Sequence, residues 1–356
     1  MNSKATNKER WEDEDFQESE YFQKVLLLNL KVDKGQELLR IDKFLLHRIP
    51  QTTRNKIQQS IENGLVLVNQ KQVKSNYKIR PNDHLLVYGF HEEETTEIVP
   101  EDIPLDIVFE DDDLIIVNKP YGMVVHPGHG NRSGTLVNAI AHHLLKTTPD
   151  KELMPRVGLV HRIDKDTSGL LVIGKTEKAL MSLSEQFMNH TVQREYQALV
   201  WGDILDDEGT IRSFIGRHER FRKLFTVYQE DDEKGKYAVT HYKVLERMNY
   251  VTLIECRLET GRTHQIRVHM KHIGHTLFND LMYGGDRILK GTIYNKYKAF
   301  VDNCFDLCPR QALHAKTLGF VHPTTGEKIL FESALPDDMH QLIEKWRAYC
   351  KTKRMI

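Results

Sequence analysis

The segment HRIDKDTSG, residues 161–169, places charged side chains between two apolar runs. Arg162, Asp164 and Asp166 occupy alternate positions, where the flanking pattern would otherwise indicate a buried strand. An aspartate beside basic residues stays ionised near neutral pH, because a nearby opposite charge favours the charged form. Such a carboxylate can serve as a nucleophile, as a metal ligand or as a group that caps a turn.

A turn explains the end of this segment but not its beginning. Asp166, Thr167, Ser168 and Gly169 are residue types that form turns through their short side chains or a permissive backbone, so we expect a turn at 166–169. Arg162 and Asp164 have no such structural explanation. They are therefore the first candidates for chemistry.

A second segment, LETGRTHQIRVHMKHIGH at residues 258–275, is basic and predicts a helix. Its apolar residues recur with helical spacing, while His264, Arg267 and Lys271 fall on a different face. An arginine on that face could hold either a phosphate or the carboxylate of Asp164. The residues alone leave both partners open.

Two groups of potential metal ligands are weak candidates. His269, His272 and His275 are three residues apart, but that spacing drifts around a helix and no carboxylate accompanies it. Cys304 and Cys308 lack a second ligand pair. We therefore predict no metal site.

The glycine-rich stretch at 117–140 indicates a loop rather than a nucleotide site. It contains neither a GKS or GKT sequence nor a GxGxxG sequence, so no nucleotide cofactor is expected. Tyr196, in QREYQALVWG, lies in an alternating strand, where aromatic residues usually belong to the core. We expect Tyr196 to face the interior, with Arg194 and Glu195 pointing the other way.

The charge distribution favours a polyanionic partner. The net charge is −1, yet residues 9–20 carry seven acidic residues against one arginine. Residues 36–89 carry nine Lys or Arg against four Asp or Glu, a local net of +5, and 262–275 contains no acid. Basic segments of this kind are typical of nucleic-acid binding.

Several classes of protein are disfavoured. No apolar run approaches the ~18 residues that span a bilayer, and the N-terminus lacks the apolar region of a secretory signal. The four cysteines lack CxxC spacing and indicate reduced thiols. We expect a cytoplasmic protein without a membrane partner, with a monomer as the default.

The chain divides into four predicted regions. Residues 1–20 form a disordered acidic tail, 21–90 a compact unit, 91–104 a linker, and 105–356 a larger domain. The larger domain alternates strands, such as LIIVNK and VTLIECRL, with helices at 135–146, 177–189 and 263–273, and ends in a charged helix.

The compact unit resembles the ribosomal-protein-S4-like RNA-binding domain. Two helices followed by short strands carry the pattern RIDKFL, GLVLVN and YKIRPNDHLLV. Lysines and arginines on such helices can bind a phosphate backbone, but phosphate contacts position RNA rather than select it. The predicted RNA-binding residues of this unit are Arg40, Lys43, Arg54 and Lys56.

The larger domain resembles the RluA-type pseudouridine synthases, most closely the subfamily that acts on the large ribosomal subunit. The segments IIVNKPYGMVVHPG, HRIDKDTSGLLV, REYQALVWG, GRTHQIRVHM and RQALHAKTLGFVHPTTGE occur in that order. The resemblance implies an α+β fold with a mixed, largely antiparallel sheet and flanking helices, plus a small N-terminal α/β S4-like domain. It covers residues from about 20 to 345.

The resemblance also implies residue roles. Asp164 matches the catalytic aspartate, Tyr196 the active-site tyrosine that packs against the base, and Arg267 the basic partner of the aspartate. Arg162 matches the arginine that fills the gap left by a flipped-out uridine. The other residues that we predict to contact substrate or RNA are Leu313 in the pocket, Arg262 as a weaker candidate, His161, His264, Lys119 and His126.

The implied activity is the isomerisation of uridines to pseudouridine in large-subunit ribosomal RNA or assembling ribosomal particles, with no cofactor. The sequence does not choose between an adduct and a glycal route, or identify the group that accepts the C5 proton. Two alternatives use other chemistry. One is a non-catalytic RNA-binding or ribosome-assembly factor, and the other is a metal-dependent nuclease using the histidines at 264–275.

Overall fold

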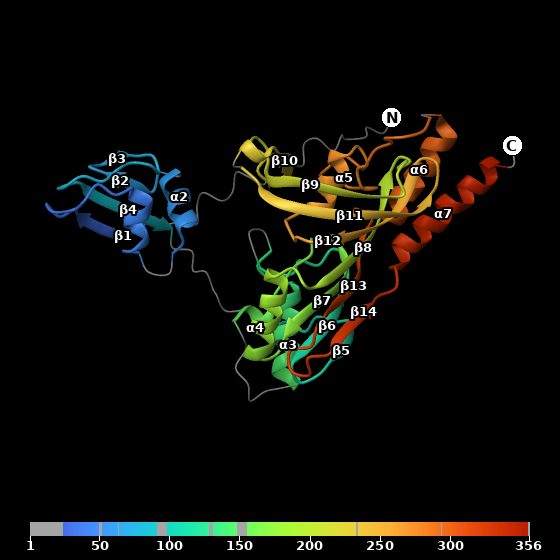
Figure 1. Ribbon diagram of the computed structural model, residues 1–356, viewed down its shortest axis with the longest axis horizontal. Helices are drawn as coiled ribbons and strands as arrows, with labels where there is room; N and C mark the ends of the chain where they lie inside the picture. The colour runs from blue at the N-terminus through green and yellow to red at the C-terminus, as the bar shows by residue number, and fades with distance from the viewer. Residues whose placement is uncertain are drawn as a thin grey trace, which may run out of the picture. The chain divides into compact units, whose positions relative to one another are not determined.

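The protein forms two compact units, Met1–Glu97 and Ile98–Ile356, in a computed structural model (Figure 1). The residues that the structure describes are 24–49, 52–62, 64–90, 98–127, 131–147, 155–232, 234–292 and 294–354. The predicted acidic tail at 1–20 lies outside them.

The first unit packs two helices against a small antiparallel sheet. Among its described residues the strand order is β1 (Lys24–Lys31), β4 (His84–Phe90), β2 (Val66–Val68) and β3 (Lys71–Gln72). The helices are α1 (Ile41–Leu46) and α2 (Arg54–Glu62). The apolar residues that predicted these helices are confirmed as core, because Ile41, Phe44, Leu45, Ile57 and Ile61 are all buried.

One buried carboxylate organises the basic side chains of this unit. Asp42 is fully buried and accepts hydrogen bonds from Arg40 and Arg54, with Nη2-to-Oδ2 distances of 2.9 and 2.8 Å, and from the Gln58 amide at 2.9 Å. Burial alone would raise the pKa of the Asp42 carboxyl, but these hydrogen bonds and the charge of Arg40 outweigh it and hold that pKa well below its usual value. The two arginines remain 39% and 43% exposed.

The second unit is built on one twisted sheet. Its described strands are β5 (Ile107–Glu110), β6 (Leu114–Lys119), β7 (Ser168–Gly174), β8 (Gln193–Trp201), β9 (Glu208–Arg217), β10 (Phe225–Tyr228), β11 (Lys236–Arg247), β12 (Val251–Leu258), β13 (Leu313–Val321) and β14 (Lys328–Glu332). Their order is β10-β9-β11-β12-β8-β13-β7-β6-β5, with β14 paired to β13. Only β7 and β13 run parallel among these described strands. The sheet is mixed and largely antiparallel, as predicted.

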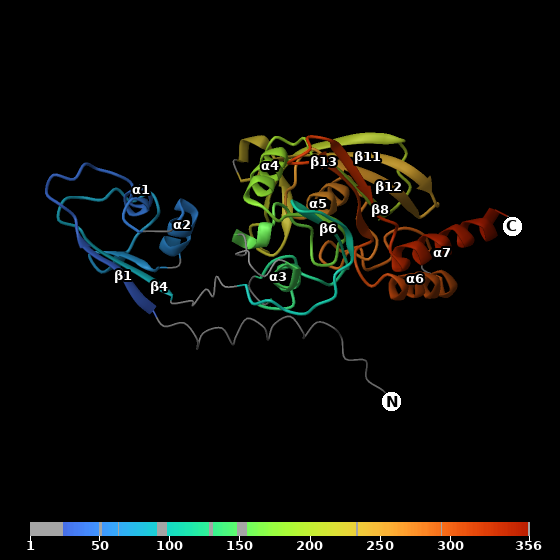
Figure 2. The same ribbon diagram turned by 90° about the horizontal axis from the view of Figure 1, so that it is seen from below.

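Helices cover both faces of this sheet. Helices α3 (Leu136–Thr147) and α5 (Gln265–His272) pack on one face, and α4 (Glu177–Met188), α6 (Asn295–Leu307) and α7 (Asp337–Arg354) pack on the other. Figure 2 shows α3 and α4 on opposite sides of β6, with α6 and α7 alongside each other. The described chain also has two short 3-10 turns, η4 (Pro155–Gly158) and η5 (Glu230–Asp232). Among the described helices, none combines the length and the apolar content needed to cross a bilayer.

Several elements of the larger domain were not predicted. These are helix α6 and strands β5, β9, β10, β11 and β13, of which β9, β10 and β11 extend the sheet well beyond β12. The second part of the predicted linker at 91–104 contacts the larger unit. The Glu101 amide donates to the Asn138 carbonyl, and the Asn138 side chain donates to the Val99 carbonyl, so residues 98–104 belong to the larger unit.

We predict that Asp42→Asn destabilises the first unit and removes much of its sensitivity to acid. Because the pKa of Asp42 is lowered by folding, its stabilisation is complete above its ordinary value of 3.8 and is lost as pH falls further. The neutral amide should cost roughly 3 kcal/mol near pH 7, since a fully buried carboxylate that pairs with two partly exposed arginines is lost. Methyl NMR signals of the buried isoleucines, followed in urea from pH 6 to pH ~2.5 in the full chain, measure both effects.

Glu62→Gln is the matched control, because Glu62 lies exposed on the adjacent helix α2. Its variant should unfold like the wild type at every pH. Equal acid sensitivity in the Asp42→Asn protein and the wild type would contradict the prediction.

Candidate active site

The start of β7 fixes the position of the HRIDKDTSG segment. Strands β7 and β13 begin at the same edge of the sheet, where Gly169 pairs with Ala315 and Ala315 pairs with Tyr196. The turn lies earlier than predicted, because the Thr167 amide donates to the Asp164 carbonyl at 3.1 Å, whereas Ser168 and Gly169 are the first residues of β7. Gly169 has φ of +120°, and a Cβ there would collide with the Ala315 carbonyl. Gly169 is therefore needed for the close pairing of β7 with β13 and not for the turn.

Two buried cations hold this loop from behind. The Lys119 ammonium donates to the carbonyls of Pro120, Met123 and Lys165 at 2.8, 2.9 and 2.9 Å. The Arg310 guanidinium donates to the carbonyl of Asp166 at 3.1 Å and pairs with Asp338 at 2.7 Å. The two central carbonyls of the Asp164–Thr167 turn, those of Lys165 and Asp166, are thus bound by residues distant in sequence.

The prediction that Lys119 contacts RNA is corrected by these bonds. Its side chain is 1% exposed and is not part of the cavity described below. Burial lowers the pKa of the Lys119 ammonium to about 7, although the charge of Asp166 acts in the opposite direction. Lys119 positions the loop that carries Asp164.

The side chain of Asp164 pairs with Arg267, which resolves the alternative that the sequence left open. Arg267 Nη1 donates to Asp164 Oδ2 at 2.9 Å, while Nε and Nη2 donate to the two carboxylate oxygens of Asp280 at 2.7 and 2.9 Å. Burial alone would lower the pKa of Arg267, but the hydrogen bond and charge of Asp280, together with Asp164, raise it. Asp280 is fully buried, whereas Asp164 keeps 20% of its side chain exposed. The guanidinium is fixed on its buried side and presents Asp164 to the cavity.

A second contact chain reaches Asp164 through His264. His264 Nε2 lies 3.9 Å from Asp164 Oδ2, and its Nδ1 is 2.8 Å from the Tyr283 hydroxyl. That hydroxyl accepts a hydrogen bond from the Phe225 amide, and the Tyr283 ring packs under Arg267 at 4.9 Å. Burial lowers the pKa of His264 despite the nearby Asp164 charge. His264 is therefore favoured in its neutral form beside the carboxylate.

Strand β8 contributes two side chains to the site, not one. Tyr196 is buried and lines the cavity, as expected, and burial raises the pKa of its hydroxyl. Arg194 was expected to point the other way from Tyr196. It nevertheless lines the same cavity, with its guanidinium over the ring of Phe187 of α4.

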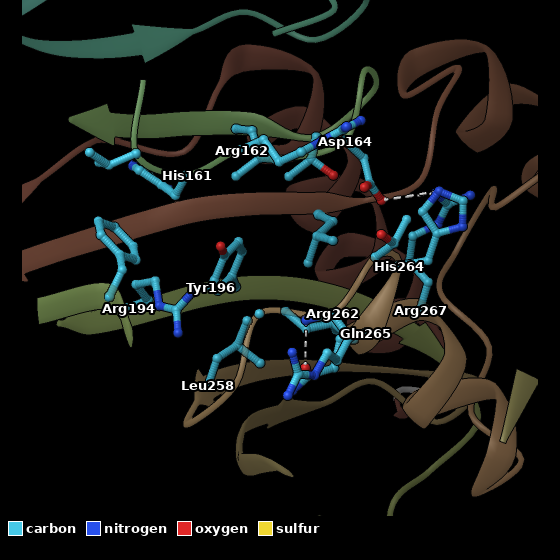
Figure 3. Close-up of a pocket in the computed structure, with 18 of the residues that line it drawn as sticks. His161, Arg162, Asp164, Arg194, Tyr196, Leu258, Arg262, His264, Gln265 and Arg267 are labelled. Carbon is cyan, nitrogen blue, oxygen red and sulfur yellow. Dashed lines mark hydrogen bonds and ion pairs between the residues drawn. The ribbon is translucent and has the colours of Figure 1, made fainter. Parts of the chain in front are cut away.

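The cavity between these elements has a volume of about 620 Å³. Its lining includes the predicted residues Arg162, Asp164, Tyr196, Arg262, His264, Arg267, His161 and Leu313. Figure 3 shows Tyr196 between the Arg194 side chain and the paired Asp164 and Arg267. Among the described lining residues Asp164 is the one acid, against four arginines. The size suits a nucleotide, and the charge favours an anionic ligand.

The remaining predicted residues take varied positions. His161 stacks on Phe187 with centroids 4.4 Å apart, and its Nε2 accepts the Val172 amide at 3.0 Å. His126 is not among the lining residues, and its Nδ1 bonds the Pro127 carbonyl. Arg262 donates from Nε to the Tyr237 carbonyl at 3.0 Å. Lys43 is exposed on α1, and the side chain of Lys56 lies outside the described part.

The histidines that were weak candidates for metal ligands have other partners. His269 is buried between the hydroxyls of Ser213 and Thr240, each at 2.8 Å, and His275 bonds the Trp201 carbonyl. Within the described residues, no three His, Cys, Asp or Glu side chains gather as a metal site would require.

The site includes residues that sequence reasoning did not single out. Asp280, Tyr283, Arg310 and Asp338 hold the named site residues, and Gln265 locks the turn before α5 by accepting from Thr260 and from the Arg262 amide. A usable signal existed for Asp280 and Tyr283, because FNDLMYGG places an acid and an aromatic three residues apart. The period of two along β8 was a signal for Arg194.

Comparison with known proteins assigns both units. The RNA pseudouridylate synthase family matches residues 113–272, and the S4 domain family matches residues 39–85. An uncharacterized RNA pseudouridine synthase of Chlorobaculum parvum is 47% identical over 324 residues, covering 90% of this chain and 98% of the relative. The ribosomal large subunit pseudouridine synthase D of Nitrosomonas europaea is 44% identical over 320 residues, covering 90% and 88%.

The fold has a solved counterpart in the human RNA pseudouridylate synthase domain containing 4. The alignment covers 68% of this chain and 92% of that chain, with a TM-score of 0.53 and 23% identity, which supports the fold alone. The chain belongs to the RluA-type RNA pseudouridine synthases and carries an S4 domain. It is an RNA-modifying isomerase.

We predict that Asp280→Asn destabilises the catalytic unit by about 3–5 kcal/mol, because it removes the charge that compensates a buried guanidinium. The variant should also lose activity, since Arg267 is then held by Asp164 alone. Urea unfolding followed by the fluorescence of buried Trp201 and Trp346 measures the first effect.

Glu246→Gln provides the comparison, because its pair with Arg347 is about one third exposed on both sides. That exposed pair should contribute less than about 1 kcal/mol. An Asp280→Asn protein as stable as Glu246→Gln would contradict the assignment of Asp280 as the buried anchor.

Proposed function

We propose that this enzyme isomerises specific uridines in large-subunit ribosomal RNA, with Asp164 as the group that acts on the nucleoside. The observation that carries the proposal is the Asp164–Arg267 pair at a nucleotide-sized cavity. The guanidinium holds the carboxylate in one orientation at the cavity and pairs with its charge. The name of the Nitrosomonas europaea relative supports large-subunit ribosomal RNA as the substrate.

The chemistry requires a uridine that has left the base stack. The N1–C1′ bond breaks, the base rotates, and a C5–C1′ bond forms, after which C5 loses a proton and N1 gains one. Flipping the nucleotide costs a few kcal/mol of stacking and pairing. Arg162 is exposed at the cavity and has no hydrogen bond or ion pair within the described structure, so its planar cation can take the place of the flipped base.

Inside the cavity the remaining residues divide between binding and chemistry. Tyr196 and Leu313 provide apolar surface on which a uracil ring can pack. Asp164 acts at C1′ or C6 as nucleophile or charge stabiliser, and Arg267 holds it in position. The Tyr196 hydroxyl has no hydrogen-bond partner among the described residues and is one candidate for accepting the C5 proton.

The S4 unit adds affinity without choosing the target base. Asp42 orients Arg40 and Arg54 while leaving each partly exposed, which suits them to hold phosphates in a fixed geometry. One of the two positive charges is compensated by Asp42, so the pair presents a net single charge together with preorganised donors.

The first functional prediction concerns Asp164→Asn. Purified protein should release tritium from uridine labelled at C5 in large-subunit ribosomal RNA, and the variant should lose this activity by at least about a thousandfold, since the acting group is removed. Asp166→Asn is the control, because Asp166 lies in the same loop but does not line the cavity. Undiminished release by the Asp164→Asn protein would refute the mechanism.

The second concerns the target. Deleting the gene should remove pseudouridine from particular positions of large-subunit ribosomal RNA, and the wild-type protein should restore them while Asp164→Asn should not. Sequencing for pseudouridine across both ribosomal RNAs provides the measurement. If modification is lost only from other RNAs, the proposed substrate is wrong. If Asp164→Asn restores growth without modification, the essential role is RNA binding instead.

A further inference from the structure

The guanidinium of Arg194 is buried at one end of the active-site cavity, and none of the described residues provides a counter-ion for it. The residue is 8% exposed, and within the described structure its guanidinium has no hydrogen bond or ion pair. Its Nε is fully buried with no acceptor, and the guanidinium lies over the ring of Phe187, 5.4 Å from the centroid. By contrast, Arg267 and Arg310, which are buried to a similar degree, each pair with a carboxylate.

An isolated buried charge is costly, because the protein interior does not replace the hydration that the charge has lost. The aromatic ring of Phe187 offsets part of this cost but supplies no hydrogen-bond acceptor. A guanidinium that stays unpaired in the free protein and lines a ligand cavity is therefore prepared for an oxyanion that arrives with the ligand. Planar guanidinium groups bind phosphate oxygens in a bidentate manner.

The surroundings of Arg194 leave room for such an anion. The described lining offers one carboxylate, Asp164, and that carboxylate is already paired with Arg267. Gly261 faces the guanidinium, and a Cβ at that position would lie 2.8 Å from Arg194 Nη1. The absence of a side chain at Gly261 keeps one edge of the guanidinium clear.

The neighbouring histidine does not compete for the anion as a cation. His161 Nε2 accepts the Val172 amide, which requires that nitrogen to be unprotonated. Burial, assisted by the charge of Arg194, lowers the pKa of His161 to about 3. The positive charge at this end of the cavity therefore belongs to Arg194, and the residues Ser184 and His190 form the rim beside it.

We propose that Arg194 binds a backbone phosphate adjacent to the flipped uridine, and this inference rests on the proposed function. Arg194 and Tyr196 are two residues apart on β8, about 6.6 Å along the strand, so the bound group belongs to the substrate next to the base on Tyr196. A uracil carbonyl could accept a hydrogen bond from Arg194 but would leave its charge uncompensated. A phosphate satisfies both the donors and the charge.

The test measures RNA binding without turnover, in the full-length Asp164→Asn protein. Filter binding of in vitro transcribed large-subunit ribosomal RNA is compared across sodium chloride concentrations for Arg194→Met, Arg194→Lys and Arg257→Met. The last is the matched control, since Arg257 is exposed on β12 and pairs across the sheet with Glu195, not with a cavity residue.

We expect Arg194→Met to weaken binding about tenfold or more, as loss of a charged hydrogen-bonded contact implies. The slope of log affinity against log salt should become shallower by about 0.7–0.9, which corresponds to one phosphate contact. Arg194→Lys should keep the wild-type slope, because its charge is retained, and Arg257→Met should keep both slope and affinity.

Thermal unfolding of the free variants provides the second measurement. Arg194→Met should melt at or above the wild-type temperature, because it removes an unpaired buried charge while keeping a long apolar side chain. A variant that melts lower or fails to fold would assign Arg194 a structural role and overturn the proposal. Weaker binding with an unchanged salt slope would also overturn it, in favour of a contact to the neutral base.

These outcomes are separate from those of the proposed function. Absence of tritium release by the wild-type protein would refute uridine isomerisation in this RNA, while the salt slope would still decide whether Arg194 contacts a phosphate.

Discussion

The carboxylate of Asp164 depends on a guanidinium that is itself held on its far side by the fully buried Asp280. Two carboxylates share one cation, but only one of them is open to the cavity. The buried pair therefore fixes the geometry, while the open carboxylate is the one that a ligand in the cavity can reach. Because Arg267 cannot follow Asp164 away from Asp280 without leaving a buried charge unpaired, the Asp164 carboxylate is presented in one orientation. The rest of the site is arranged around this constraint.

The sheet determines where the loop that carries Asp164 lies. Parallel strands β7 and β13 begin at one edge, so the loop before β7 and the residues at the start of β13 lie together there. Lys119 and Arg310 bind carbonyls of the loop from behind, and neither lines the cavity. Lys119 and Arg310, which are far apart in the sequence, are therefore buried because they hold the loop in place. They satisfy backbone groups that a sharply turning loop would otherwise leave unpaired.

The cavity and the S4 unit differ in whether their arginines are paired with a carboxylate. In the S4 unit, the single carboxylate of Asp42 pairs with both Arg40 and Arg54. This pairing fixes the positions of the two guanidinium groups and reduces their combined charge from two to one. In the cavity, Arg162 and Arg194 are left without carboxylate partners in the described structure. The first arrangement suits a surface that positions RNA, and the second suits a pocket that receives an anionic ligand.

The order of motifs determined the family, and the motifs singled out Asp164, Tyr196 and Arg267, which the structure places around one cavity. Apolar spacing was sufficient for the main helices and the S4 core, because those patterns are local. The resemblance implied that Arg267 is the partner of Asp164, 103 positions away, but only the tertiary structure showed that Asp280 holds Arg267 from its far side and that Lys119 is buried behind the loop. The same holds for Arg194. The sequence shows an arginine in a strand, but whether a counter-ion lies beside it depends on every element that folds around it.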